Sequence, residues 1–418
     1  MSLTITPKIF YVGNFLFPDR DAASHRVHGI GKALRDKGYE VVYLGAESDG
    51  RPQDAISVNE YRYDGFSYYP SGEAGSTPIK RLSRLWSTYL TGNSVVKRLD
   101  ALWTEQSVAV FAYQASTLLL ARLRRYCTKH NAVLVTDVVE WFDRSHAILG
   151  RFGPLALDSA FNIRYMQGCR ADGVVAISSY LENYYSRGGK ATIRIPVLID
   201  IQADCISGIS IQQRSSSTLQ LAFVGTAGKK DLLVNAIRGL TLLGEEVRKW
   251  ELVIVGPSRS EVITSLGKDA KILDGLNGIV RFVGAVSHAE ALSYLEKSDF
   301  SILLRQDLRV SHAGFPTKLV ESMAMGVPVI CNLTSDIGIY VRDGQEGLVV
   351  PDCSSEAFAS GLRRAMALSL EERLVMRSNA RRMAENSFDY RNWSESLGKF
   401  MSRLIAGHKL KNSEYVQK

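Results

Sequence analysis

Residues 313–330 read AGFPTKLVESMAMGVPVI, a pattern that predicts a loop, a helix, a stop and a strand in that order. Apolar residues recur at helical spacing over residues 319–324. Gly326 and Pro328 end that helix, and the apolar residues around Pro328 resume as a buried strand. Lys318 falls in the first helical turn, where a cation opposes the positive end of the helix dipole unless an anion is bound there. The stretch therefore predicts a phosphate-binding site at the start of a helix.

The bulk composition is that of a globular protein large enough for two domains. The chain has 418 residues, 45% of them hydrophobic and 22% charged, which predicts two domains of roughly 200 residues. No apolar run reaches the ~18 residues needed to span a bilayer, and residues 1–10 lack the basic and apolar regions of a signal peptide. Five scattered cysteines show no metal or redox spacing. We therefore expect a cytoplasmic protein with reduced thiols.

The positive charge of the chain is concentrated in one segment. The net charge is +8, and nine Lys or Arg stand against two acidic residues between Pro78 and His130. Apolar side chains interleave with this charge over residues 82–90, so the segment could form an amphipathic helix on anionic lipid at the cytoplasmic face of the inner membrane. It could equally be a solvated basic face packed on the first domain. No nucleic-acid-binding motif accompanies the charge, so nucleic acid is not an expected partner.

Strands and helices alternate along the chain in two cycles, which predicts an α/β fold of two doubly wound, Rossmann-like domains. Residues 201–218 are polar, rich in Ser and Gln and without periodicity, so we expect a linker there between residues 1–200 and residues 219–387. Residues 388–418 include a helical run whose apolar side could pack on either domain. The strands are expected over residues 8–13, 39–45, 108–113, 132–137, 173–177, 219–225, 252–256, 280–284, 300–304 and 327–330, and helices over residues 22–37, 231–240 and 288–297.

The motif within residues 313–330 resembles glycosyltransferase family 4, whose members retain anomeric configuration and have the two-domain GT-B fold. That family carries a Glu, seven residues and a second Glu around Gly-Phe-Gly, followed by Glu-Ala-Met-Ala and Gly-x-Pro-Val. Phe315, Glu321 and the residues after them match this pattern, whereas Ala313 stands where the first Glu belongs and Pro316 replaces a Gly. The form Gly-Phe-Pro-Thr-Lys resembles a branch that acts in bacterial surface-polysaccharide assembly. The resemblance implies that the two domains face a central cleft and that the last helix crosses back to the first domain.

A second candidate phosphate site is the stretch GTAGKKD, residues 225–231, which follows a strand and enters a helix, where open parallel sheets bind their ligands. The family has an Arg and a Lys here that grip the diphosphate of the donor. Lys230 matches the Lys, but Thr226 occupies the Arg position. Lys318, or Arg305 at the end of a strand, could supply the missing cation, although Arg305 could also be an ordinary surface cation.

Glu321 lies about one turn into its helix, and two roles fit it. It could form a surface pair with Lys318 three residues earlier, which is worth ~0.2–0.5 kcal/mol. The resemblance instead gives its two carboxylate oxygens to the ribose diol of a nucleotide, and we favour this role because the surrounding motif matches. The expected donor-binding residues are Gly13, Gly225, Thr226, Lys229, Lys230, Gly256, Arg305, Gly314, Phe315, Pro316, Thr317, Lys318 and Glu321.

The first domain offers candidate residues for the acceptor. Asn14 lies in the loop that follows the first predicted strand, directly after Gly13, and His25 and Arg26 lie at the start of the next helix. Family members use this loop for acceptor or phosphate contacts, which makes Asn14, His25 and Arg26 candidate acceptor-binding residues. A polar helix start would explain the same residues nearly as well.

The candidate catalytic residues are Lys230, Lys318 and Glu140. Glu140 follows a predicted strand at about the place where many relatives have a His near the donor sugar. Residues 19–21 read Asp-Arg-Asp and so match the Asp-x-Asp of metal-dependent transferases. That pattern is short and belongs to another fold class, so we expect no metal.

The resemblance implies a retaining hexosyltransferase with a nucleoside-diphosphate sugar as donor, a glycan or lipid-linked acceptor, and no cofactor. Negative charge grows on the leaving diphosphate as the anomeric carbon becomes oxocarbenium-like, and fixed cations stabilise that state more than the ground state. A non-catalytic nucleotide-sugar-binding partner of a polysaccharide complex is the alternative, because Ala313 replaces a Glu. An NAD-linked enzyme fits less well, since the loop after the first strand lacks Gly-x-Gly-x-x-Gly.

Overall fold

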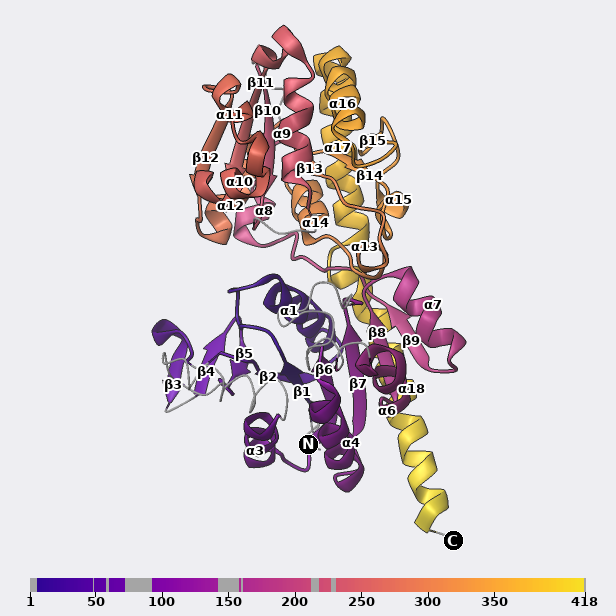
Figure 1. The fold of residues 1–418 in the computed structure, drawn as a ribbon. Helices are drawn as coiled ribbons and strands as arrows, with labels where there is room; N and C mark the ends of the chain where they lie inside the picture. Colours follow the sequence, from indigo (N-terminus) through magenta and orange to yellow (C-terminus); the bar gives the residue numbers. More distant parts are fainter. Residues whose placement is uncertain are drawn as a thin grey trace. The chain divides into compact units, whose positions relative to one another are not determined.

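The chain folds into two compact units, each built on its own sheet (Figure 1). The computed structural model describes residues 6–47, 49–57, 60–71, 92–141, 158, 161–211, 218–226 and 231–416. The first unit comprises Met1–Leu198 together with Tyr390–Lys418, and the second comprises Ile199–Asp389. None of the helices in the described ranges is both long enough and apolar enough to cross a bilayer.

The first unit is built on a nine-stranded sheet of order β3-β4-β5-β2-β1-β6-β7-β8-β9. Its pairs are parallel from β5 through β2 and β1 to β9, and the pairs β3–β4 and β4–β5 are antiparallel. The central strand β1 has no exposure from Ile9 to Val12, as expected for a parallel strand covered on both faces. The strands are β1 (Lys8–Gly13), β2 (Glu40–Leu44), β3 (Ala55–Ser57), β4 (Glu60–Tyr63), β5 (Phe66–Tyr68), β6 (Ser107–Tyr113), β7 (Val133–Val138), β8 (Gly173–Ala176) and β9 (Ala191–Arg194).

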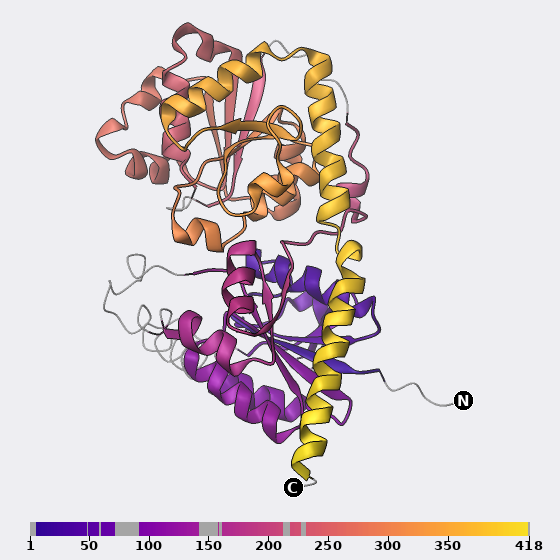
Figure 2. The same cartoon turned by 90° about the vertical axis from the view of Figure 1, so that its right-hand side faces the viewer.

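The last helix of the described chain, α18 (Arg391–Val416), packs on the first unit alongside α1 (Ala22–Arg35) (Figure 2). Leu397 and Met401 of α18 are fully buried, and Lys37 Nζ just after α1 lies 2.5 Å from Glu395 Oε2. This confirms the expectation that the final helix returns to the first domain. The other helices of this unit are α3 (Asn93–Leu102), α4 (Thr117–Lys129), α6 (Gln167–Arg170) and α7 (Ser179–Arg187), with a π-helical turn at Asn162–Met166 and a 3-10 turn at Pro52–Asp54.

The second unit is built on a six-stranded parallel sheet of order β12-β11-β10-β13-β14-β15. The order of connection reverses between β10 and β13, and in open α/β sheets ligands bind beyond the carboxyl ends of the strands at such a switch point. The strands are β10 (Leu219–Val224), β11 (Trp250–Val255), β12 (Val280–Gly284), β13 (Phe300–Leu303), β14 (Val329–Asn332) and β15 (Gly347–Val350). The helices are α8 (Asp204–Ser207), α9 (Leu233–Thr241), α10 (Arg259–Leu266), α11 (Ile272–Gly275), α12 (His288–Glu296), α13 (Arg309–Ala313), α14 (Thr317–Ala324), α15 (Ile337–Tyr340), α16 (Ser355–Ala367) and α17 (Leu370–Ser387), with 3-10 turns at Gly244–Lys249 and Gly267–Asp269.

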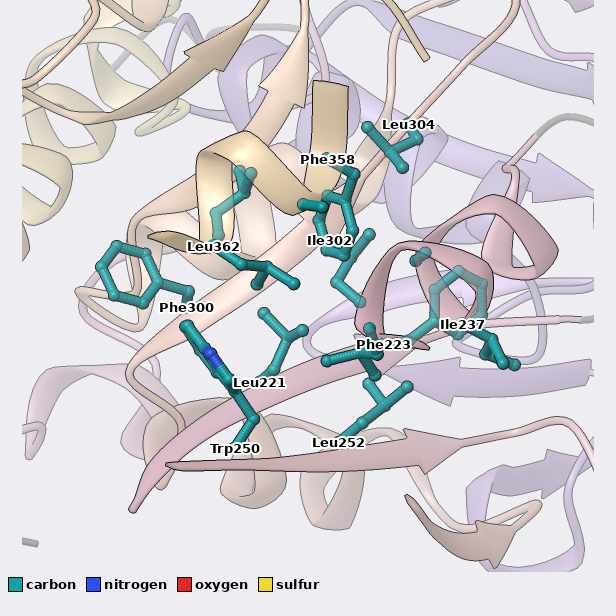
Figure 3. Close-up of a cluster of buried hydrophobic side chains, with 14 of the residues drawn as sticks. Leu221, Phe223, Ile237, Trp250, Leu252, Phe300, Ile302, Leu304, Phe358 and Leu362 are labelled. Carbon is teal, nitrogen blue, oxygen red and sulfur yellow. The ribbon is translucent and has the colours of Figure 1, made fainter. Parts of the chain in front are cut away.

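The core of the second unit lies between this sheet and helices α9 and α16 (Figure 3). Trp250 and Phe300 are buried at the starts of β11 and β13, the two strands that flank β10, with ring centroids 6.5 Å apart. Each such side chain contributes about 1.5–3 kcal/mol through burial. Helices α9 and α16 approach closely at Gly239, where a Cβ would lie 2.9 Å from the ring of Phe358. This core holds the carboxyl ends of β10 and β13 in place.

The observed boundaries of strands and helices agree best with the predicted ones where residues that favour turns follow the element. Strands β1 and β12 have the predicted bounds, whereas α1 ends at Arg35, two residues before the predicted end, because the chain turns there toward Gly38. Strand β11 begins at Trp250, two residues before the predicted start. The second unit begins at Ile199 and includes α8, inside the stretch that the sequence assigns to a linker; residues 212–217 of that stretch lie outside the described residues.

Candidate functional site

Three glycines end neighbouring strands at the carboxyl edge of the second sheet. Gly225, Gly256 and Gly284 follow or end β10, β11 and β12, with φ angles of 141°, 106° and 81°. The Gly225 amide donates to Val255 O at 3.0 Å, and the Gly256 amide donates to Gly284 O at 2.8 Å. A Cβ on Gly256 would lie 1.9 Å from Gly225 O, so no other residue fits that position without a shift. A Cβ on Gly284 would meet nothing within 4 Å, so of these three glycines only Gly284 leaves open space beside the backbone.

A buried carboxylate joins two cations at the switch point. Asp231 Oδ1 lies 2.7 Å from Arg305 Nε, and Asp231 Oδ2 lies 2.7 Å from Lys318 Nζ. The three side chains are only 12%, 12% and 19% exposed, in that order. Asp231 precedes α9, Arg305 follows β13, and Lys318 lies in the first turn of α14. The fold thus brings together residues that are 74 and 87 positions apart, and two of the three are predicted site residues.

The backbone around this cluster is held by hydrogen bonds between β13 and its neighbours. Asp231 and Arg305 form an isolated antiparallel bridge, and the Leu232 amide donates to Leu304 O at 2.9 Å. The Arg305 amide donates to Asn332 Oδ1 at 2.9 Å, and Asn332 Nδ2 donates to Arg305 O at 2.8 Å. Both backbone groups of Arg305 are therefore fixed, which directs its side chain toward Asp231.

The two cations of the cluster favour the ionised form of Asp231. Burial would raise the pKa of Asp231, but the charges of Arg305 and Lys318 outweigh it and lower that pKa to about 2. Burial lowers the pKa of Lys318, and Asp231 opposes this by raising it. Lys318 Nζ also lies 4.0 Å from the centroid of the Phe223 ring, over the face of the aromatic group. The Lys318 ammonium is thus poorly solvated, and an anion near it would be strongly attracted.

The buried position of Lys318 depends on Gly225. A Cβ on Gly225 would lie 2.3 Å from Lys318 Cε and 2.6 Å from its Nζ. Thr226, the next residue, is exposed. The cation from α14 therefore lies against the end of β10, beside the position where the sequence expected an Arg and has a Thr.

Glu321 makes a hydrogen bond with a histidine that sequence reasoning missed. His288 Nε2 lies 3.0 Å from Glu321 Oε1, and the two side chains are 38% and 16% exposed. His288 is the first residue of α12, after the capping Ser287, whose side chain accepts from the Glu290 amide. The predicted surface pair with Lys318 is not formed, since that ammonium pairs with Asp231. Glu321 is nevertheless close enough to help raise the pKa of Lys318.

The loop before α14 is fixed by packing. Phe315 is 6% exposed, and its ring lies 5.5 Å from that of Tyr340 and 6.0 Å from that of Phe388. Ser335 Oγ donates to Gly314 O. Pro316 caps α14 and Thr317 is its first residue, so Phe315 anchors the helix start whose amides the motif places at the phosphate site. A direct contact between these four loop residues and the donor stays a prediction.

Of the remaining predicted donor-binding residues, two lie outside the described residues and one, Gly13, lies in the first unit. Lys229 and Lys230 lie outside the described residues, and α9 begins at Leu233, three positions after Lys230. Gly13 ends β1 with φ 148°, and a Cβ there would lie 2.2 Å from Tyr113 O, so the glycine allows β1 and β6 to approach. Its predicted role at the donor is not tested by this packing.

Arg26, predicted at the acceptor, is held in the core of the first unit. Its Nη2 lies 2.6 Å from Asp137 Oδ1, and its Nη1 donates to the carbonyls of Ile195 and Pro196 at 3.0 Å. Tyr11 Oη donates to Asp137 Oδ2 at 2.6 Å. Arg26 is 2% exposed and Asp137 fully buried, so this network ties α1 to β7 and to the chain after β9. The geometry gives Arg26 a structural role and adds no support for acceptor binding.

The other predicted residues of the first unit lie near the carboxyl ends of its strands. Asn14 is exposed just after β1, and His25 is partly exposed in the first turn of α1. Glu140 is partly exposed two residues after β7, close enough to Tyr113 to add to the rise in its pKa that burial causes. The roles of Asn14, His25 and Glu140 stay predictions.

Both aspartates of the Asp-x-Asp pattern, Asp19 and Asp21, have structural roles in the described chain. Asp21 caps α1 by accepting from the Ser24 amide at 2.7 Å, and Asp19 Oδ2 lies 2.9 Å from Arg51 Nη1. Within the ranges that the structure describes, no group of three or more His, Cys, Asp or Glu side chains could hold a metal ion.

The comparison with protein families agrees with the site on the second sheet. Residues 210–383 match the family described as Glycosyl transferases group 1. This match spans most of the second unit, Ile199–Asp389, and less than half of the chain. It covers Gly225, Gly256 and Gly284, the Asp231 cluster and Glu321.

Curated relatives and solved structures extend the likeness beyond this domain. An uncharacterized glycosyltransferase of Methanocaldococcus jannaschii is 24% identical over 242 residues, which is 56% of this chain and 59% of that protein. WcaL of Escherichia coli, a glycosyltransferase named for colanic acid biosynthesis, is 30% identical over 91 residues, or 22% of each chain. The matches thus span less than two thirds of the length of these relatives.

The solved structure of Anabaena HepE in complex with UDP resembles the whole chain, with a TM-score of 0.64. The sequences are 16% identical, and the match covers 96% of this chain and 100% of HepE. At this identity the likeness shows the fold. The two parallel Rossmann-like sheets, with the last helix on the first unit, are those of the GT-B glycosyltransferases.

Proposed function

We propose that this protein is a retaining glycosyltransferase that moves a hexosyl group from a nucleoside-diphosphate sugar to a glycan or a lipid-linked acceptor. The observation that carries the proposal is the pair Arg305 and Lys318, held at the switch point of the second unit. The family match over residues 210–383 and the complexes of HepE with UDP and with UDP-glucose support a nucleotide-sugar donor. The partial likeness to WcaL supports bacterial surface polysaccharide, such as O-antigen, capsule or exopolysaccharide, as the product.

In this reaction the main role of the protein is electrostatic stabilisation. The bond between the anomeric carbon and the diphosphate oxygen breaks, the acceptor hydroxyl oxygen bonds to the same carbon on the same face, and its proton passes to the leaving phosphate. Charge grows on the diphosphate, where Lys318, Arg305 and Lys230 would stabilise it more in the transition state than in the ground state. Glu140 would lie near the sugar, and Asn14 and His25 near the acceptor. No protein nucleophile takes part in this scheme.

The test is release of free nucleoside diphosphate. The purified chain is incubated with UDP-, GDP- or ADP-linked hexoses and candidate glycan or lipid-linked acceptors, after a thermal-shift screen has selected the nucleotide that stabilises it most. Acceptor-dependent release with retained configuration in the product supports the proposal. Binding without release under all donor and acceptor combinations contradicts it.

That second outcome would favour a non-catalytic nucleotide-sugar-binding partner of a polysaccharide assembly complex. One observation favours this alternative: Ala313 is fully buried where the family has a Glu, so no carboxylate stands at that position. Nucleotide binding and catalysis are therefore measured separately.

Glu321→Ala should weaken binding of the nucleoside diphosphate itself, because we propose that the carboxylate accepts from the ribose hydroxyls. Hydrogen bonds to charged groups contribute ~1.5–3 kcal/mol, so the dissociation constant should rise roughly 10- to 100-fold. Isothermal titration measures it. Glu290→Ala, an exposed glutamate near the start of α12, is the matched control and should bind normally. Unchanged binding by Glu321→Ala, with only lower stability, would leave it as a helix-surface residue.

We also propose that the reaction takes place at the cytoplasmic face of the inner membrane, with the basic segment between Pro78 and His130 on anionic lipid. Residues 78–91 lie outside the described residues, but Lys97 on α3 and Arg125 and Lys129 on α4 are exposed. Each cation near an anionic surface is worth about 1 kcal/mol and is screened over about a Debye length.

Replacing Lys97, Arg125 and Lys129 by Gln should therefore reduce co-sedimentation with anionic vesicles at least tenfold, and salt should reduce it for the unaltered chain. The matched control replaces three exposed lysines of the second unit, Lys249, Lys268 and Lys271. Equal recovery of the unaltered chain with neutral and anionic vesicles would count against membrane contact.

A further inference from the structure

The carboxylate of Asp231 is paired with the two cations that we expect to bind the diphosphate. Asp231 gives one oxygen to Arg305 and the other to Lys318, both at 2.7 Å. An aspartate here repels a phosphate, so its presence needs a reason other than direct binding. The resemblance assigns the diphosphate to an Arg and a Lys near this point, and gives no role to the residue at position 231.

We propose that Asp231 is a positioning residue that holds Arg305 and Lys318 together as one anion-binding pair and keeps Lys318 protonated before the donor arrives. This inference rests on the proposed function of the site. It names the pair from β13 and α14, rather than an Arg after β10, as the receiver of the leaving phosphate. Thr226 at the expected Arg position then needs no replacement within its own loop.

The geometry leaves donors of both cations available. Arg305 uses Nε for Asp231, and its two terminal nitrogens have no hydrogen-bond partner among the described residues. Lys318 Nζ is buried, and its ion pair with Asp231 leaves other hydrogens of the ammonium without an acceptor in that part of the chain. The cluster has a net charge of +1, so the pair can still attract a diphosphate while Asp231 fixes its spacing.

Asp231 also decides whether Lys318 carries a proton. The groups that face Lys318 are Asp231 before α9, Arg305 after β13, Glu321 on its own helix and the Phe223 ring of β10. Lys229 and Lys230 directly precede Asp231 and lie outside the described residues. Burial and Arg305 lower the pKa of Lys318, and Asp231 is the first of the influences that raise it. Without Asp231 the pKa falls further, and the free protein loses this charge at a lower pH.

The test is the proton balance of nucleotide binding in Asp231→Asn. An anion binds the protonated form of Lys318, so a variant whose Lys318 is neutral must take up a proton when it binds. Titration calorimetry with UDP, GDP or ADP, whichever binds the unaltered chain best, is run in two buffers of different protonation enthalpy. We expect Asp231→Asn to take up more protons than the unaltered chain, up to one more, and to bind at least tenfold more weakly at pH 8 but not at pH 6. Adding Lys318→Arg should abolish the extra uptake, because arginine stays protonated.

Controls separate this inference from the proposed function. Asp269→Asn removes a carboxylate paired with Arg238 at 2.6 Å in the same domain and should behave as the unaltered chain. If the unaltered chain binds none of the three nucleotides, the proposed function fails. If it binds and Asp231→Asn matches it in affinity and proton uptake, or binds more tightly at every pH, the positioning role is overturned and the function stands. Asp231→Ser, with the same expected uptake, replaces the asparagine variant should that variant not fold.

Discussion

Lys318→Ala should lower kcat/KM of sugar transfer about 10²- to 10³-fold, the loss expected when one group that stabilises developing charge is removed. The Lys318 side chain is 19% exposed, and its buried ammonium lies over the Phe223 ring and against Gly225 at the carboxyl end of β10. Its contact with the leaving oxygens strengthens as the bond to the sugar breaks, so the rate should fall more than nucleotide affinity. Initial rates of nucleoside-diphosphate release at several donor concentrations give kcat/KM.

A second substitution tests whether Lys318 supplies the cation that Thr226 lacks. Thr226→Arg in the Lys318→Ala background should restore part of the rate, giving a non-additive pair, as expected for two sites that share a ligand. Lys268→Ala, an exposed lysine on the same domain, is the matched control and should transfer normally. Additive effects of the two substitutions would make Lys318 an ordinary helix residue and would direct attention to Arg305 and Lys230.

Asp137→Ala should lower the free energy of unfolding of the first unit by about 3–5 kcal/mol, because breaking one side of a buried ion pair leaves an uncompensated charge. Arg26 is 2% exposed, and after the substitution it keeps only the carbonyls of Ile195 and Pro196. Tyr11 Oη loses its acceptor as well. Denaturant unfolding, followed by a probe in the first unit, measures the loss.

The matched comparison is an exposed pair of the same unit. Glu395→Ala removes the partner of Lys37, whose side chain is 34% exposed, and should cost about 1 kcal/mol or less. Combining Arg26→Met with Asp137→Ala should recover part of the loss, since the buried charge is then gone. A loss no larger than that of Glu395→Ala would show that Arg26 finds water or another partner.

The sequence predicted the elements whose signals are local. The apolar run of β1, the Gly326 stop after α14 and the motif around Phe315 each lie within one short window, and the two parallel sheets follow from their alternation. The short strands β3 to β5 were missed because three or four residues carry too little periodicity. Helix α9 begins two residues later than predicted because Asp231 is held in a bridge to Arg305.

Side-chain pairing across the sheet could not be predicted in the same way. Arg26 and Asp137 are 111 residues apart, and nothing near Arg26 in the sequence distinguishes a buried ion pair from an acceptor contact. Asp231 stood in the candidate phosphate loop, but its two partners come from other strands and helices. His288 offered only a helix start as a signal for its bond to Glu321. Chemistry that depends on distant pairs becomes visible only when the fold brings them together.

The path of the chain has a consequence for how the protein is made. The chain leaves the first unit after Leu198 and re-enters it at Tyr390, and Ile199 and Asp389 are paired side by side at the two crossings. Leu397 and Met401, which are needed to fill the core of the first unit, are therefore synthesised about two hundred residues after its sheet. The second unit, Ile199–Asp389, is continuous, and all its strands precede α18 in the chain. During synthesis the first unit therefore begins before the second unit and is completed after it.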